Sequence, residues 1–142
     1  MRTPMYFRTY DKFPAEAKAI RTEVFVKEQK FQEEFDSVDE YATHIIAFDE
    51  DKPIAVCRYF QNEEGKYVVG RLAVIQSYRG KNVGAKVIAE AERQVRELGG
   101  DSLRLHSQLQ AQEFYAKQGY IGGGEIEYEE FCPHIWMSKN LV

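Results

Sequence analysis

Cysteine is scarce in this chain of 142 residues, and long apolar runs and an excess of positive charge are absent. The two cysteines, Cys57 and Cys132, lie far apart without CxxC spacing, so we expect no disulfide framework. The three histidines are scattered without the spacing of metal ligands, so we expect no metal site. No run of about 18 apolar residues exists, which excludes a membrane-spanning helix. The net charge of -4 argues against a nucleic-acid partner, which favours a basic face.

The composition is that of an ordinary globular protein, with 44% hydrophobic and 30% charged residues. The length fits one core, so we expect a single domain covering residues 1–142. The segment Met1–Tyr6 lacks the apolar stretch of a signal peptide, and we therefore expect a cytoplasmic location. The oligomeric state stays open, with a homodimer as one option.

Strand and helix patterns alternate along the chain, which is typical of an α/β or mixed α+β domain. Apolar spacing predicts helices over residues 15–27, 82–98 and 108–118. It predicts strands over residues 5–9, 43–48, 54–60, 66–75 and 103–106, and a closing hairpin from 120–128 and 134–139. Because the helix 82–98 links two strands, those strands should run parallel to each other.

A basic loop with two glycines joins the strand 66–75 to the helix 82–98. Gly80 and Gly84 allow a ligand to approach the backbone closely, and the first turn of a helix offers free N–H groups and partial positive charge. Arg79, Lys81 and Lys86 add full charges. The loop therefore predicts an anion site suited to a pyrophosphate, although a tight turn alone would explain the glycines. Neither GxxxxGK[ST] nor GxGxxG is present.

Together with the helix 108–118, this loop resembles the GNAT (GCN5-related) N-acetyltransferase family. Arg79 opens and Gly84 ends a Q/R-x-x-G-x-G/A loop, and Phe114-Tyr115 with Gly119 matches F/L-Y-x-x-x-G-F/Y. Segments 21–29, 36–44 and 133–137 extend the resemblance to the ElaA/YjcF-like branch over nearly the whole chain.

Two positions depart from the family pattern. Asn82 stands where the loop motif has its first glycine, so we expect an ordinary helical conformation there. Gln108 stands where many members have an asparagine that contacts the cofactor or substrate. The same contact is therefore not implied for Gln108.

The resemblance implies the GNAT acyl-CoA N-acyltransferase fold, a mixed sheet of about six to seven strands flanked by about four helices. It implies acetyl-CoA as co-substrate and direct acetyl transfer to a primary amine. Tyr115 would protonate the departing thiolate. The cofactor would contact Leu72, Ala73, Val74, Arg79, Gly80, Lys81, Asn82, Val83, Gly84, Ala85, Gln108 and Phe114.

The acceptor site is the least specified part of the prediction. Acidic residues between Glu33 and Glu40, with Glu129 and Glu130, predict an acidic mouth for a cationic amine. The acceptor would contact Arg21, Gln29, Asp36 and Asp39. The base stays open between His134, as the leading candidate, His106 and the acidic stretch.

Two alternatives to this function remain. One is acetylation of an amino-sugar phosphate, whose phosphate would seek Arg21, Arg71 or Lys27. The other is a sensor that binds acyl-CoA without turnover, and the acidic residues would then only solvate a loop.

Overall fold

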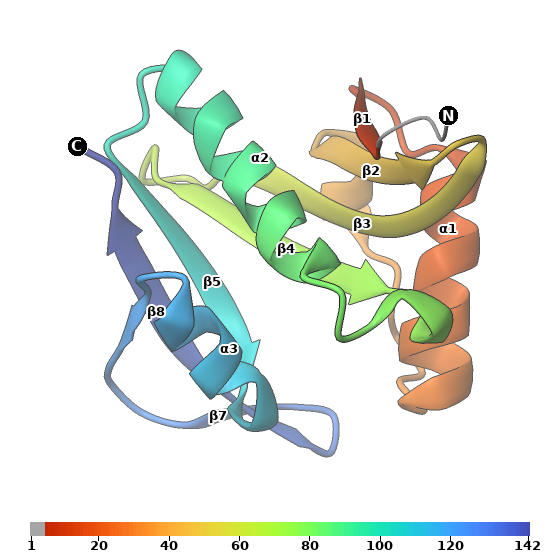
Figure 1. The fold of residues 1–142 in the computed structure, drawn as a ribbon. Coiled ribbons are helices and arrows are strands. Elements are labelled where there is room, and N and C mark those ends of the chain that lie inside the picture. Colours follow the sequence, from red (N-terminus) through yellow and green to blue (C-terminus); the bar gives the residue numbers. More distant parts are fainter. Residues whose placement is uncertain (1–4) are drawn as a thin grey trace.

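The molecule is a twisted mixed β-sheet with helices on both faces (Figure 1). This computed structural model describes residues 5–142, so the residues before Met5 in the N-terminal segment lie outside it. The strands are β1 (Tyr6–Tyr10), β2 (Thr43–Asp49), β3 (Lys52–Gln61), β4 (Tyr67–Val74), β5 (Ser102–Gln108), β6 (Ile121–Gly122), β7 (Glu127–Glu129) and β8 (Cys132–Asn140). The helices are α1 (Ala15–Arg21), α2 (Val83–Glu97) and α3 (Gln112–Lys117), with a π-helix η1 (Thr22–Glu28) and the 3-10 turns η2 (Ser37–Glu40), η3 (Gln76–Tyr78) and η4 (Leu109–Ala111).

The strands follow the order β1-β2-β3-β4-β5-β8-β6, and β7 pairs with the free end of β8. Only β4 and β5 pair in parallel among the described residues, which confirms the prediction for the strands on either side of α2. The sheet of the described residues has eight strands, one more than the upper limit of the six to seven strands that we expected. The extra strand arises because segment 123–126, which begins with two glycines, divides the expected strand 120–128 into β6 and β7.

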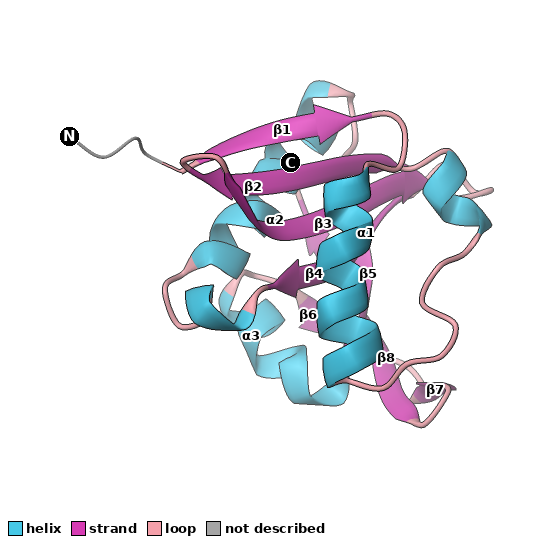
Figure 2. Cartoon of the chain, turned by 90° about the vertical axis from the view of Figure 1, so that its right-hand side faces the viewer, coloured by secondary structure: helices cyan, strands magenta, loops and turns pink. Residues whose placement is uncertain are grey.

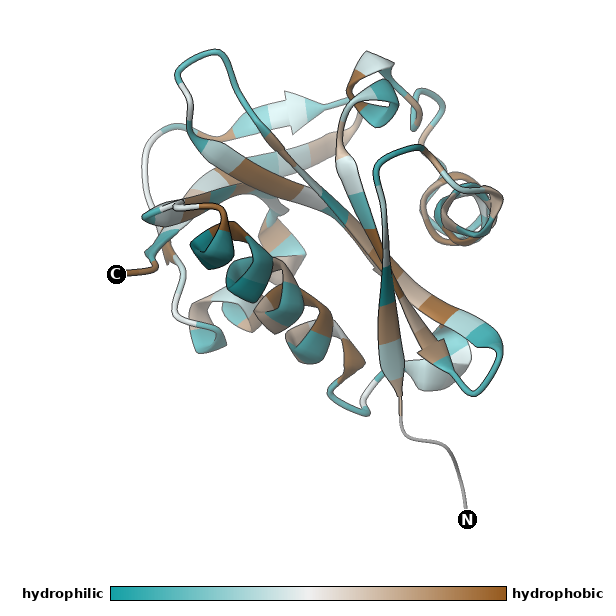
Figure 3. Cartoon of the chain, turned by 90° about the horizontal axis from the view of Figure 1, so that it is seen from above, coloured by the Kyte–Doolittle hydropathy of each residue, from teal (hydrophilic) through white to brown (hydrophobic). Residues whose placement is uncertain are grey.

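The helices cover the two faces of the sheet unequally. Helix α1 packs on one face and α2 and α3 on the other, as Figure 2 shows. The apolar side of α2 faces the sheet and its polar side faces outward (Figure 3), with Val87, Ala91 and Val95 fully buried. None of the helices within residues 5–142 combines the length and apolar character needed to cross a membrane.

The helix predicted over residues 15–27 changes type partway. It is α-helical to Arg21 and continues as the π-helix η1, whose wider turn appears in the bond from the Gln29 N–H to the Val24 carbonyl at 3.0 Å. Wide turns of this kind often occur at functional sites. Here the π-helix brings Val24, Phe25 and Gln29 to the wall of the cavity described below.

Strands β4 and β5 pair at only two positions, Tyr67 with Leu103 and Val68 with Arg104, and then diverge. The cause lies on the other edge of β4, where the pairing with β3 shifts register between Val56 and Arg58. Opposite this shift, Arg71 has a left-handed φ of 53°. A bulge of this kind bends a strand, so the carboxyl-terminal halves of β4 and β5 separate.

Candidate active site

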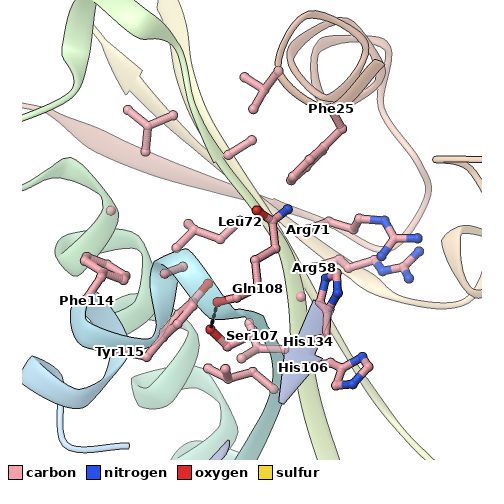
Figure 4. A pocket seen from close by; sticks show the side chains of 18 of the residues that line it. Phe25, Arg58, Arg71, Leu72, His106, Ser107, Gln108, Phe114, Tyr115 and His134 are labelled. Atoms are coloured by element: carbon pink, nitrogen blue, oxygen red, sulfur yellow. Dashed lines mark hydrogen bonds between the residues drawn. The ribbon is translucent and has the colours of Figure 1, made fainter. Parts of the chain in front are cut away.

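A cavity of about 1130 Å³ lies where β4 and β5 separate. Pockets for drug-sized ligands measure about 300–1,000 Å³, so this one has room for a large ligand or for two molecules. Figure 4 shows Tyr115 and Phe114 on one side of Gln108, and His106 and His134 on the other. We call these two parts the donor side and the acceptor side.

The donor side begins at the loop between β4 and α2. Gly80 has φ 75° and Asn82 has φ 66°, so the expectation of an ordinary helical conformation for Asn82 is wrong. Asparagine is among the few residues that tolerate the left-handed region, because its short polar side chain limits the steric cost. Asn82 therefore reproduces the backbone turn of the glycine that the family motif has there, and α2 begins directly after it.

Gly84 lies in the first turn of α2, against Phe114 of α3. A Cβ atom built on Gly84 would lie 3.3 Å from Phe114 Cζ and 3.8 Å from Val74 Cγ2. A larger side chain would press on both walls of the cavity at this point. The close contact explains why glycine and Phe114 occur together in the two motifs.

The charges of the loop differ from the expectation. The Arg79 guanidinium bonds both Glu28 carboxylate oxygens, at 2.6 and 2.7 Å, and its Nε donates to the Val74 carbonyl at 2.9 Å. Arg79 thus joins the end of β4 to η1 and shares its charge with Glu28. Lys81 is not among the residues that line the cavity, and its Nζ lies 5.3 Å from the Tyr78 ring. Arg79 nevertheless lines the cavity, as expected for a donor-side residue. The first N–H groups of α2, which have no partner within the helix, add partial positive charge there.

The remaining predicted donor residues line the cavity together: Leu72, Ala73, Val74, Gly80, Asn82, Val83, Gly84, Ala85, Gln108, Phe114 and Tyr115. The half-buried Tyr115 ring packs edge-on against Phe114 and Tyr120, at 5.0 and 6.0 Å between ring centroids. Burial raises the pKa of Tyr115, so its phenol keeps its proton at neutral pH.

Gln108 marks the border between the two sides. Its Nε2 donates to Gln29 Oε1 at 2.8 Å, and its own Oε1 accepts from Gln110 at 2.7 Å. Since Gln29 follows η1 and Gln108 ends β5, the amide pair crosses from one wall of the cleft to the other.

On the acceptor side, three arginines and three carboxylates form a closed ring of ion pairs. Arg21 binds Glu34 at 2.8 Å and Asp39 at 2.6 Å, and Arg58 binds Asp39 at 2.8 Å. Arg58 also binds Asp36 at 2.6 Å. Arg71 completes the ring with Asp36 at 3.4 Å and Glu34 at 3.0 Å. The six charges sum to zero, and we call this group the ion-pair ring.

The ion-pair ring changes the interpretation of three predicted acceptor contacts. Arg21 is fully buried and Asp39 is 3% exposed, and neither lines the cavity. Asp36 and Gln29 do line it, but Asp36 is paired with Arg58. The structure therefore places Arg21 and Asp39 in a structural network behind the cavity wall.

The electrostatics of Asp39 follow from that network. Burial alone would raise the pKa of Asp39, but hydrogen bonds and charge attraction from Arg21 and Arg58 outweigh it and lower the pKa to about 2. The same balance lowers the pKa of Asp36. Burial prevails at Glu34 and raises its pKa, although Arg71 and Arg21 offset part of the effect.

A second polar cluster on the acceptor side contains His106, His134, Glu127, Glu129 and Trp136. The Glu129 carboxylate hydrogen-bonds His106 Nδ1 and lies 3.6 Å from His134 Nε2. His106 stacks on Trp136 with ring centroids 4.5 Å apart. All but Glu127 line the cavity. Within residues 5–142, no group of three or more His, Cys, Asp or Glu side chains is arranged to hold a metal ion.

Comparison with known proteins identifies the family. The family model described as an acetyltransferase (GNAT) domain matches residues 10–141. The uncharacterised N-acetyltransferase YjcF of Bacillus subtilis (strain 168) is 33% identical over 124 residues, which cover 85% of this chain and 88% of YjcF. The chain belongs to the GNAT acetyltransferase family. It is therefore an acyltransferase, and the resemblance found in the sequence is confirmed.

Solved structures show the same GNAT fold. Escherichia coli ElaA superposes with a TM-score of 0.85 at 23% identity, covering 96% of this chain and 100% of ElaA. An aminoglycoside 6'-N-acetyltransferase complexed with coenzyme A superposes with a TM-score of 0.75 at 16% identity, covering 96% of this chain and 97% of that enzyme.

The sequence of this GNAT protein did not predict the ion-pair ring or the contacts of Glu129 with His106 and His134. A weak signal for the ring was available, because Arg58 lies in the otherwise apolar strand 54–60 and a buried arginine requires a partner. Glu129 was expected only as part of the acidic mouth, and no sequence signal marked its contacts with His106 and His134, which depend on how the hairpin docks.

Proposed function

We propose that this GNAT protein transfers an acetyl group from acetyl-CoA to a primary amine by direct attack, with residues 1–142 acting as one catalytic domain. The observation that carries the proposal is that the bulged edge of β4 and the left-handed loop before α2 open onto one cavity. The fold shared with an acetyltransferase complexed with coenzyme A supports this use of the cavity.

The donor side suits the parts of acetyl-CoA in order. A pyrophosphate beside residues 80–85 would bind the free N–H groups at the start of α2 and gain from the α2 dipole. The pantetheine arm would lie along β4 from Leu72 to Val74, where β5 no longer supplies hydrogen bonds. Backbone N–H groups there would polarise the thioester carbonyl and stabilise the oxyanion that forms on attack.

Tyr115 is the proposed acid for the leaving group. It lines the donor side and holds its proton at neutral pH because burial raises its pKa. A thiolate that develops beside the phenol would take this proton, which prevents the reverse attack of sulfur on the new amide.

We assign the acceptor as a cationic amine, as expected, but attribute its attraction to part of the predicted acidic mouth rather than to Asp36 and Asp39. The ion-pair ring is neutral as a group, so Asp36 and Asp39 add little net field. Glu33, Glu129 and Glu130 line the cavity and are not part of the ring. They would attract a cation to the mouth, and His134 would take its proton before attack. Arg21 and Arg71 are committed to the ring, and Lys27 does not line the cavity, so the amino-sugar phosphate alternative loses the cations that it needs.

Calorimetric titration with acetyl-CoA and CoA tests the donor site. Gly84→Asp should abolish binding, because it adds bulk beside Phe114 and negative charge at the helix start. Gly84→Asn is the matched control, since it has nearly the same size without the charge, and it should keep part of the affinity. Equal affinity of both variants would show that no anion lies at this turn, and lack of binding by the natural chain would refute the donor site.

A thiol-release assay with acetyl-CoA and a panel of amines tests turnover. Cadaverine, tyramine and glucosamine 6-phosphate cover an aliphatic cation, an aromatic cation and an amino-sugar phosphate. We expect release of CoA with the two cations and little with the phosphate. Binding of acetyl-CoA without release with any amine would favour the sensor instead.

A further inference from the structure

The second polar cluster of the acceptor side, which contains His106 and His134, lies on three adjacent strands, β5, β8 and β7. Cross-strand pairs align His106 of β5 with Trp136 of β8, and His134 of β8 with Glu127 of β7. Because alternate residues of a strand point to the same face, these side chains and Glu129 share one face of the sheet. The cluster therefore results from the pairing of β5, β8 and β7 rather than from a local sequence motif.

The hydrogen bonds fix which nitrogen of His134 can accept a proton. His134 Nδ1 lies 2.9 Å from the Cys132 carbonyl oxygen, which can only accept a hydrogen bond. Nδ1 therefore carries the proton, and the neutral ring presents the lone pair of Nε2. That nitrogen lies 3.6 Å from Glu129 Oε2, and His134 lines the cavity although it is only 5% exposed.

Glu129 is held from its other side by His106. An ionised carboxylate can only accept, so the bond between His106 Nδ1 and Glu129 places a proton on that nitrogen. The His106 ring is fixed in turn by its stacking on Trp136. Its Nε2 lies 3.3 Å from Glu127 Oε1. The two imidazole centroids are 4.9 Å apart, and Glu129 bonds one ring and lies close to Nε2 of the other.

The hairpin that carries Glu129 is anchored to the far wall of the cavity. The Glu130 carboxylate accepts from the N–H groups of Gln32 and Glu33, at 2.9 and 3.0 Å. Phe131 stacks on Phe31 with ring centroids 5.1 Å apart. These contacts limit the freedom of the β7–β8 turn, so Glu129 is held in position beside the histidines.

We propose that Glu129 and His106 are positioning residues that make His134 the base of the acetyl transfer. This inference rests on the proposed function. Glu129 would stabilise the imidazolium that forms when His134 accepts a proton, and His106 would hold Glu129 in place. Glu129, His106 and His134 thereby receive a role, although none of them takes part in binding acetyl-CoA or in protonating the thiolate.

The proton balance of the reaction fits this arrangement. The acceptor ammonium loses one proton to His134 Nε2, and the neutral amine nitrogen then forms a bond to the thioester carbonyl carbon. On collapse the C–S bond breaks, the thiolate takes the Tyr115 proton, and the nitrogen loses its second proton. One of the two protons thus replaces that of Tyr115, and the other leaves through the partly exposed Glu129 to water.

The first test measures the titration of both imidazoles by NMR in the protein without ligand. The ionisable groups around His134 are Glu127 and Glu129 of β7, His106 of β5 and Cys132 of its own strand. Glu129→Gln should move the NMR titration of His134 to lower pH, because the variant removes a negative charge 3.6 Å from Nε2 that favours the imidazolium. The exposed Glu125→Gln on the same connection should leave it unchanged. An unchanged His134 pKa in Glu129→Gln would overturn the proposal.

The second test compares two variants of His106 in turnover with the best amine of the panel. His106→Asn keeps an N–H donor near the Nδ1 position, whereas His106→Leu removes it. We expect about a 10-fold loss of kcat in His106→Leu and much of it restored in His106→Asn, with the acid limb of the kcat/KM profile shifted only in the former. Equal losses in both variants, with an unshifted profile, would reduce His106 to packing. Inactivity of the natural chain would instead refute the proposed function, while the NMR titration would still decide the role of Glu129.

Discussion

On the donor side of the cavity the backbone makes the site, whereas on the acceptor side it is made by side chains from distant segments. The donor side consists of the β4 bulge, the left-handed turn at Gly80 and Asn82, and the start of α2, all within residues 71–84. The acceptor side combines η1, the segment 31–39, β3, β5 and the β7–β8 hairpin. A backbone site tolerates many side chains, while a side-chain site depends on each of its members.

The two sides also differ in how they treat charge. The donor side offers the partial positive charge of the first N–H groups of α2, which have no partner within the helix. The acceptor side holds six full charges and compensates each of them within the ion-pair ring. Four of these residues are buried, namely Arg21, Glu34, Asp39 and Arg58. Removal of a single member should therefore have a far larger effect on stability at the acceptor side.

The largest expected effect is on Arg21, which is fully buried in the ion-pair ring. Arg21→Met removes one charge and leaves Glu34 and Asp39 buried without part of their compensation. Breaking a buried pair in this way costs about 3–5 kcal/mol. Urea unfolding should show this loss in the free energy of unfolding.

Arg93→Met is the matched control, because Arg93 also pairs with two carboxylates, Glu90 and Glu97, but at an exposed position of α2. Its free energy of unfolding should change by less than about 1 kcal/mol. Similar losses in both variants would mean that the ion-pair ring is no more important to stability than a surface pair.

The second effect concerns chemistry on the donor side. Tyr115→Phe keeps the packing against Phe114 and Tyr120 but removes the proton that we assign to the thiolate. Turnover should fall by about 10²-fold, while the affinity for CoA stays nearly constant. Steady-state kinetics and calorimetry check both parts, and an unchanged kcat with chemistry rate-limiting would leave Tyr115 as a packing residue.

The difference between the two sides explains how much the sequence could predict. The parallel pairing of β4 and β5, the helix α2 and the loop between them depend on local periodicity and glycine spacing, and these predictions are confirmed. The family resemblance rests on the same segments. The conformation of Asn82 was the local exception, because the prediction did not weigh the tolerance of asparagine for the left-handed region.

The acceptor side could not be predicted in the same way. The five acidic residues from Glu33 to Glu40 have the composition of a solvated loop. Nothing near them in the sequence shows that three arginines from other elements neutralise three of them. Side-chain pairing between distant elements depends on tertiary register. Composition therefore predicted that this stretch of the chain is acidic, but it did not predict how much of its negative charge acts at the cavity.

The third prediction concerns acid stability, which should depend on the acceptor side. The folded pKa of Asp39 is about 2, below its unfolded value, so the ionised form stabilises the fold. This contribution, about 2 kcal/mol, is fully present above pH ~4 and is lost as the pH falls toward 2. Asp36 acts in the same direction, and Glu34, whose pKa is raised, acts weakly against it. Asp39→Asn should flatten the fall of the unfolding free energy over this range in urea titrations at stepped pH, and an equally steep fall would place the acid sensitivity elsewhere.

The smallest expected effect is on the electrostatic attraction of the acceptor amine to the mouth of the cavity. Glu33 is exposed, lines the cavity and lies outside the ion-pair ring, so Glu33→Gln should weaken the field at the mouth without disturbing the fold. One exposed charge near a cation in water contributes less than about 1 kcal/mol, so kcat/KM for a cationic amine should fall about threefold at low salt. The difference should vanish near 1 M salt, where the screening length is about 3 Å, and kcat should not change. A phosphate-bearing acceptor reverses the sign, because removal of Glu33 would then raise kcat/KM. The direction of the change at low salt therefore distinguishes an acceptor that enters as a cation from one that enters as an anion.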